Sequence, residues 1–196
     1  KELKTSDGES FHRQVFETSS LLMDSIIKSP VPVIAAVDGL AAAAGCQLVA
    51  QCDIAICTEN STFSTPGSRF GIFCSTPGIP VVRCVNRKVA AHMLFTGLPI
   101  SSEEALRVGL VSKVVSKNNL EDEIINITNA IKASSRSVIT LGKKFFYQQL
   151  EKDIKSAYRL GSDVMVNNLS LSDAQEGIKS FIEKRKPNWN HSFTKA

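Results

Sequence analysis

The spacing of apolar and polar residues predicts an α/β first half and a helical second half. In residues 10–28 the apolar side chains fall mostly on one helical face, which predicts a helix that ends before Pro30. Residues 33–37 are apolar and carry no charge, as expected of a buried strand.

The next segment has unusually small side chains. After the turn signal Asp38-Gly39, the sequence reads LAAAAGC before the polar residue Gln47. We predict a helix over residues 43–51, a strand over 53–58 and a shorter strand at 63–65, followed by a Gly/Pro-rich loop through Gly78. Strands joined through a short helix indicate α/β layer packing.

The remaining chain is mainly helical in pattern. We expect a helix over residues 86–95, a second that starts from a capping box of Ser101 and Glu104 and ends near 108–109, and a strand over 110–115. Four further stretches have apolar residues at helical spacing: 120–131, 138–145, 154–164 and 174–181. We interpret these stripes as core or subunit interface, within a single domain of residues 1–196: a core portion, 1–115, and a helical C-terminal region, 116–196.

Charge and composition narrow the class of ligand. The 196 residues carry 23 Lys+Arg and 19 Asp+Glu, a net charge of +4. This mild excess suits an anionic small ligand and is too weak to indicate nucleic acid. No apolar run is long enough for a membrane span. The five cysteines form no CxxC pair and have no histidine at ligand spacing, so we expect buried thiols and no metal site.

The small-residue segment is the first candidate for chemistry. The first N–H groups of a helix beginning near Ala43 have no intrahelical partner, and a ligand carbonyl could reach them past such small side chains. The same residues could equally serve close packing of a helix on a strand, and the residues alone leave both readings open. Gln47 could orient a water molecule, but a carboxamide does not titrate near neutral pH and cannot act as general acid or base.

Other candidates have less support. Cys74 or Ser75 could be a nucleophile in the Gly-rich loop, but neither has an evident base nearby in sequence. His12, His92 and His191 lie in three different predicted elements and suggest no Ser/His/Asp arrangement. We interpret these histidines as surface or core residues.

Longer motifs carry more information. The segments PVIAAVDGLAAAAGCQLVAQCDIAI, FSTPG, MLFTGLPISSEEALRVGLVSKVV and EGIKSFIEKRKPNW, in this order, resemble the crotonase family of enoyl-CoA hydratases and isomerases over about residues 1–189. The resemblance implies an α/β crotonase (ClpP-like) fold: a ββα spiral core with a C-terminal helical oligomerisation region. It also implies a homotrimer or dimer of trimers, a mitochondrial location, and a coenzyme A thioester as ligand or substrate with no other cofactor.

The family's functional positions can be carried over residue by residue. The resemblance implies that the Ala44 backbone N–H holds the thioester oxygen, and that the other oxyanion donor and the family's leading strands lie outside this chain, since Lys1-Glu2 resembles the end of a D-x-K-E segment. The implied substrate pocket consists of Leu40, Ala42, Gln47, Gly67, Pro77 and Gly78. The implied coenzyme A contacts are Lys1, Phe181 and Lys184.

The sequence departs from the family at both catalytic glutamates. Their positions are occupied by Gln47 and Gly67, and the family's PGAGG stretch reads CSTPG here, which alters the pocket wall. We therefore expect no catalytic acid or base, and an acyl-CoA-binding, regulatory protein of fatty-acid metabolism with impaired hydration. The alternatives are an isomerase or thioester hydrolase, and a non-enzymatic oligomeric scaffold. If the carboxylates alone are limiting, restoring both should raise hydration more than restoring either.

Overall fold

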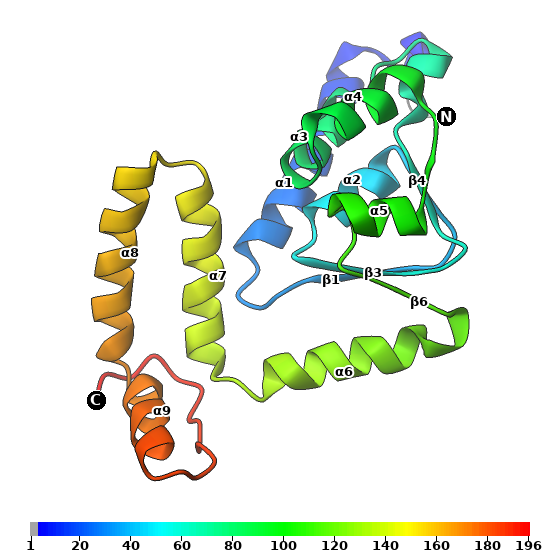
Figure 1. Ribbon diagram of the computed structural model, residues 1–196. Coiled ribbons are helices and arrows are strands. Elements are labelled where there is room, and N and C mark those ends of the chain that lie inside the picture. The colour runs from blue at the N-terminus through cyan, green and yellow to red at the C-terminus, as the bar shows by residue number, and fades with distance from the viewer. Residues whose placement is uncertain (1–3) are drawn as a thin grey trace. The chain divides into compact units, whose positions relative to one another are not determined.

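The computed structural model describes residues 4–196 as two compact units (Figure 1). The first runs up to Ile27 and from Val33 to Ile124, and the second comprises Lys28–Pro32 and Ile125–Ala196. Each is described separately below.

Two small sheets organise the first unit. The strands are β1 (Ile34–Val37), β2 (Leu40–Ala42), β3 (Ile54–Thr58), β4 (Thr62–Ser64), β5 (Ile100–Ser101) and β6 (Lys113–Val115). One sheet has the order β1-β3-β6 and is parallel, with Ala35 paired to Ala55. The other has the order β2-β4-β5: β2 and β4 are parallel, with Ala42 paired to Ser64, and β5 is antiparallel. The strands β2 and β5 were not predicted from the sequence; in the structure both pair with β4.

Helices complete this unit. They are η1 (Thr5–Asp7), α1 (Glu9–Lys28), α2 (Ala44–Gln51), η2 (Pro66–Phe70), α3 (Ser75–Cys84), α4 (Arg87–Thr96), α5 (Ser102–Val108) and η3 (Lys117–Asn119). The predicted capping box is half present: the Ser101 hydroxyl accepts the Glu104 N–H at 3.2 Å and begins α5. Gly97 and Gly109 end α4 and α5 in the left-handed conformation, as C-terminal glycines commonly do.

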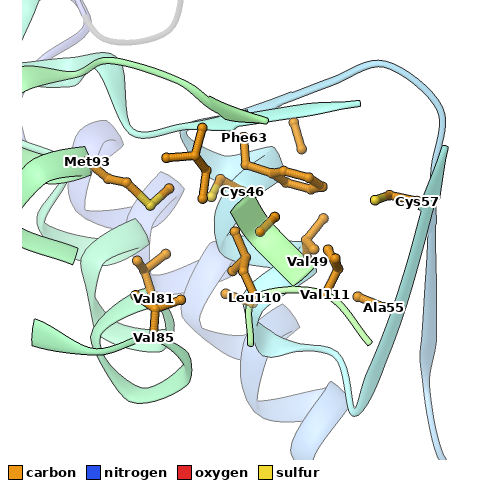
Figure 2. Close-up of a cluster of buried hydrophobic side chains, with 14 of the residues drawn as sticks. Cys46, Val49, Ala55, Cys57, Phe63, Val81, Val85, Met93, Leu110 and Val111 are labelled. Atoms are coloured by element: carbon orange, nitrogen blue, oxygen red, sulfur yellow. The ribbon is translucent and has the colours of Figure 1, made fainter. Parts of the chain in front are cut away.

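The core lies around α2, β3 and the helices packed against them. Figure 2 shows Cys46 and Val49 of α2 beside Phe63, Val81, Met93 and the other buried side chains. The side chains of Cys46, Phe63, Val81 and Met93 are completely buried. The buried side of α2 thus packs in the core and holds the helix in place, and the first turn of this helix is the candidate site.

The loop predicted to run through Gly78 is largely helical, which corrects the sequence-based expectation. It contains η2 and the beginning of α3. Pro77 occupies the first turn of α3, where an N–H would have no intrahelical acceptor. A Cβ on Gly78 would lie 3.3 Å from Leu94, so this glycine permits close packing of α3 on α4 and does not mark a turn.

The second unit is helical. After α6 (Leu120–Lys132), which begins in the first unit, come α7 (Arg136–Leu150), α8 (Ile154–Leu169) and α9 (Ser172–Ile182), and these last three pack on one another. The four helices agree with the four predicted apolar stripes. Ser135 and Asp153 cap α7 and α8 through side-chain oxygens.

Two further expectations concern membrane spans and cysteines. Within residues 4–196, none of the helices combines the length and apolar character needed to cross a membrane. All five cysteines are free thiols: Cys46, Cys57 and Cys74 are buried and Cys52 is half-buried. The expectation was wrong for Cys84, which is exposed at the last turn of α3 while its Sγ donates a 3.0 Å hydrogen bond to the Ala50 carbonyl.

Candidate functional site

The turn into α2 has an unusual backbone. Ala43, immediately before the helix, adopts φ 48° and ψ −113°. Its N–H donates to the Ser64 carbonyl at 2.9 Å, and its carbonyl accepts the Gln47 N–H at 2.9 Å. A non-glycine residue in this region is strained by about 1–3 kcal/mol, so the hydrogen bonds on both sides hold the turn in place.

This turn leaves backbone donors accessible. Ala44 is the first residue of α2, and among residues 4–196 no acceptor is hydrogen-bonded to its N–H. A Cβ built on Gly45 would meet no atom within 4 Å. Close packing inside the chain therefore does not account for the small side chain of Gly45, and a ligand oxygen could approach the N–H groups at the positive end of the helix dipole.

Gln47 lies one turn further along α2. Its side chain is buried, with 5% exposure, and its carboxamide has no hydrogen-bond partner within the described chain. The group is thus available to a water molecule or ligand, as donor and acceptor but not as a proton-transfer group.

Gly67 has no room for a side chain. A Cβ here would lie 2.0 Å from the Ile72 carbonyl oxygen and 2.7 Å from Cys74 Sγ. The loop from 67 to 74 closes on this residue: the Ile72 N–H donates to the Gly67 carbonyl at 3.0 Å, and the Gly67 N–H donates to Cys74 Sγ at 3.2 Å. The loop therefore occupies the space that any side chain at position 67 would need.

Two hydroxyls close to Gly67 in the sequence are buried, and the sequence pattern does not predict this burial; Ser68 is a candidate polar group for the alternative enzyme, whereas Thr65 was not singled out. Thr65 Oγ1 and Ser68 Oγ are buried and have no hydrogen-bond partner in the part of the chain that the structure describes. Their burial results from tertiary packing around η2, which no local pattern encodes.

The remaining predicted pocket residues are distributed over β2 and α3. Leu40 is 68% exposed, and Ala42 pairs with Ser64 beside the α2 turn. Pro77 and Gly78 are buried in α3, which packs against α2. The structure thus brings Ala42, Pro77 and Gly78 to elements that border α2, and the role of these residues in substrate binding stays a prediction.

The predicted coenzyme A residues belong to the second unit, except Lys1, which lies outside the described residues. Phe181 is 83% exposed near the end of α9. Lys184 follows with φ 53°, and its N–H donates to the Phe181 carbonyl at 3.3 Å. Both residues therefore lie at the C-terminal end of α9, where their backbones are hydrogen-bonded.

The alternative nucleophiles have no activating base. Cys74 Sγ accepts the Gly67 N–H, and Ser75 Oγ donates to the Phe73 carbonyl at 3.4 Å. Over residues 4–196 neither side chain is hydrogen-bonded to a histidine, and no cluster of three or more metal-ligating side chains is found. Nucleophilic catalysis requires such a base or another means of activation.

Comparison with known proteins gives one consistent result. Residues 2–192 match the family model described as enoyl-CoA hydratase/isomerase. The protein named enoyl-CoA hydratase domain-containing protein 3, mitochondrial, from Mus musculus is 55% identical over 191 residues, which are 97% of this chain and 64% of that protein. The short-chain-enoyl-CoA hydratase of Clostridium acetobutylicum is 34% identical, over 95% of this chain and 70% of its own length.

A solved structure extends the likeness to three dimensions. The crystal structure of human enoyl coenzyme A hydratase domain-containing protein 3 is 54% identical and superposes with a TM-score of 0.94, covering 96% of this chain and 74% of that chain. This confirms the expected crotonase fold. The chain spans somewhat less than two thirds of the mouse relative.

Proposed function

Because the chain belongs to the enoyl-CoA hydratase/isomerase family, we propose that it binds an acyl-CoA thioester but lacks the acid–base pair that hydration requires. The thioester oxygen accepts the Ala44 N–H at the start of α2. The strained Ala43 turn and the open space beside Gly45 support this role, since they present the donor to a ligand.

The geometry of Gly67 is the main observation that supports the absence of an acid–base pair. Hydration needs one group to activate water and another to protonate the α-carbon, and such catalysis typically contributes about 10²–10⁴-fold. Gln47 does not titrate, and the Ile72 carbonyl and Cys74 Sγ fill the space that a side chain at position 67 would need. The protein therefore retains at most a small fraction of ordinary hydratase activity.

The remaining parts of the proposal rest on resemblance. Phe181 and Lys184 contact the adenine and phosphate end of coenzyme A, and the protein forms a homotrimer or a dimer of trimers. The relatives named mitochondrial support a mitochondrial location. The family resemblance suggests a role in fatty-acid metabolism, where binding without turnover would be regulatory.

Calorimetric titration tests the thioester contact directly. Butyryl-CoA should bind with a dissociation constant below about 1 mM, and the thioether butyl-CoA, which has no carbonyl, should bind about two- to tenfold more weakly, because a hydrogen bond to the neutral thioester carbonyl is worth about 0.5–1.5 kcal/mol. Equal affinity would contradict the oxyanion role, and absence of binding by either would favour the non-enzymatic scaffold.

A pair of variants places the contact at Ala44. Ala44→Pro removes the N–H at the first helical position and strains Ala43, whose ψ of −113° differs from the extended value that a residue before proline prefers, whereas Ala44→Gly keeps the N–H. We expect only the proline variant to lose preference for butyryl-CoA over butyl-CoA, with thermal unfolding confirming that both fold. Crotonyl-CoA hydration within tenfold of an ordinary hydratase would overturn the inactive assignment and favour an active enzyme.

A further inference from the structure

A cavity that shares no residue with the α2 turn lies where α6 ends and α7 begins. Figure 1 shows this helix junction. The cavity has a volume of about 450 Å³ and belongs entirely to the second unit. We propose that it binds a small amphipathic anion: a carboxylate or phosphate head group attached to an apolar body. Three nitrogen-bearing side chains and an apolar wall together point to this ligand.

The positive charge of the cavity is not neutralised by the protein. Lys132 in the last turn of α6 and Arg136 at the first position of α7 both line it, and across residues 4–196 neither forms an ion pair with a carboxylate. Asp173 is the carboxylate that is connected to the cavity lining, because its Oδ2 accepts the His191 N–H. It is 1% exposed and is engaged by the hydroxyl of Ser135 and by backbone N–H groups.

Asp173 is therefore occupied inside the unit. Its Oδ2 accepts the Ser135 hydroxyl at 2.5 Å and the His191 N–H at 3.0 Å, and its Oδ1 accepts the Asn190 N–H at 2.8 Å. These bonds leave its oxygens directed to the protein interior, so the two cations at the cavity remain available to a ligand anion.

The third polar group of the cavity is held in position by the C-terminal segment. The Arg136 N–H donates to His191 Nδ1 at 3.2 Å, so a neutral ring carries its hydrogen on Nε2 and can donate it to an anion. Trp189 Nε1 donates to the Ala133 carbonyl at 2.8 Å and fixes the same segment to the junction between α6 and α7. The His191 ring is thus positioned before a ligand arrives, which favours binding.

The rest of the lining is mainly apolar, which favours a ligand whose head group carries an apolar body. It consists of Val31, Pro32, Ile131 and Ile139, together with Ser134. The segment 28–32 is attached to α7 by two hydrogen bonds, from Thr140 Oγ1 to the Pro30 carbonyl at 2.6 Å and from Lys143 Nζ to the Val31 carbonyl at 3.0 Å. Inorganic phosphate would leave this wall in water, whereas a short aliphatic or aromatic body would cover it.

Titration calorimetry of the whole protein with octanoate, octyl phosphate, inorganic phosphate and octanol tests the proposal, without any acyl-CoA present. We expect octanoate or octyl phosphate to bind with a dissociation constant below about 1 mM, and phosphate and octanol at least tenfold more weakly. The tighter of the two amphiphiles identifies the head group. Failure of both, or equal binding of octanol, would overturn the proposal.

Charge-removing variants then locate the site. Arg136→Gln and Lys132→Gln should each weaken the tighter amphiphile about tenfold or more, because a charge-assisted hydrogen bond is lost. Arg159→Gln is the matched control: it removes an exposed arginine of α8 outside the cavity lining, and its affinity should equal that of the unaltered protein. Thermal unfolding shows that the variants fold. If both cavity variants bind like the control, the cavity is not the site.

Discussion

Placing a carboxylate at position 67 is the most direct test of the proposal that this chain has no acid–base pair. The sequence suggests that Gln47→Glu combined with Gly67→Glu should act as a restored pair. The geometry changes this expectation, since the first atom of any side chain at 67 would lie 2.0 Å from the Ile72 carbonyl oxygen. The two atoms must separate by at least 1.4 Å to reach the 3.4 Å of ordinary contact.

The energetic consequence can be worked out from the contacts. Separation breaks the Ile72 N–H bond to the Gly67 carbonyl and the Gly67 N–H bond to Cys74 Sγ. Two lost hydrogen bonds contribute about 1 kcal/mol each, and overpacking adds about 1–3 kcal/mol. We expect Gly67→Ala to reduce the free energy of unfolding by about 3–5 kcal/mol, which lowers the melting temperature by about 6–20 °C. Gly67→Glu should be at least as damaging.

The assay combines thermal unfolding with crotonyl-CoA hydration for Gly67→Ala, Gln47→Glu and the Gln47→Glu/Gly67→Glu pair. Gly67→Ala separates the effect of a Cβ from the effect of a carboxylate. We expect the pair to remain within about tenfold of the unaltered protein, far below the 10²–10⁴-fold that acid–base catalysis provides. A Gly67→Ala variant as stable as the unaltered protein, or hydration raised more than a hundredfold in the pair, would refute the steric argument.

Three other outcomes follow from the structure. Arg185 lowers the pKa of Glu176 to about 2, so the stability from this ion pair is complete above pH 4.5 and disappears as the pH falls to about 2. The difference in melting temperature between the unaltered protein and Glu176→Gln should therefore shrink as the pH falls over this range. A difference that stays constant would contradict this expectation. Asp173→Ala should lose about 2–4 kcal/mol in urea unfolding because four donors lose their acceptor, whereas Asp163→Ala on α8 should lose less than about 0.5 kcal/mol. Burial raises the pKa of the Cys46 thiol to about 12, so mass spectrometry should find it unalkylated by iodoacetamide until urea is added; rapid labelling in the folded protein would disprove its burial.

The sequence predicted the helices better than the site. Apolar spacing identified α6 to α9 because each carries a stripe several turns long. It failed at α3, where Pro77 and Gly78 resemble loop residues but serve a first helical turn and a close helix contact. Motif resemblance predicts that Gln47 and Gly67 stand at the family's two glutamate positions. The obstruction at Gly67 could not be predicted in this way, because it depends on where Ile72 and Cys74 fold back.

The closed loop at Gly67 has a consequence for how this protein can change over time. A mutation that reintroduces glutamate there has no benefit until the segment around Ile72 has moved, and moving that segment first would only remove hydrogen bonds from a stable loop. A substitution at position 67 and a movement of the Ile72 segment therefore each reduce stability when made alone. If the proposed function holds, this loop makes a return to hydration a change of several residues at once.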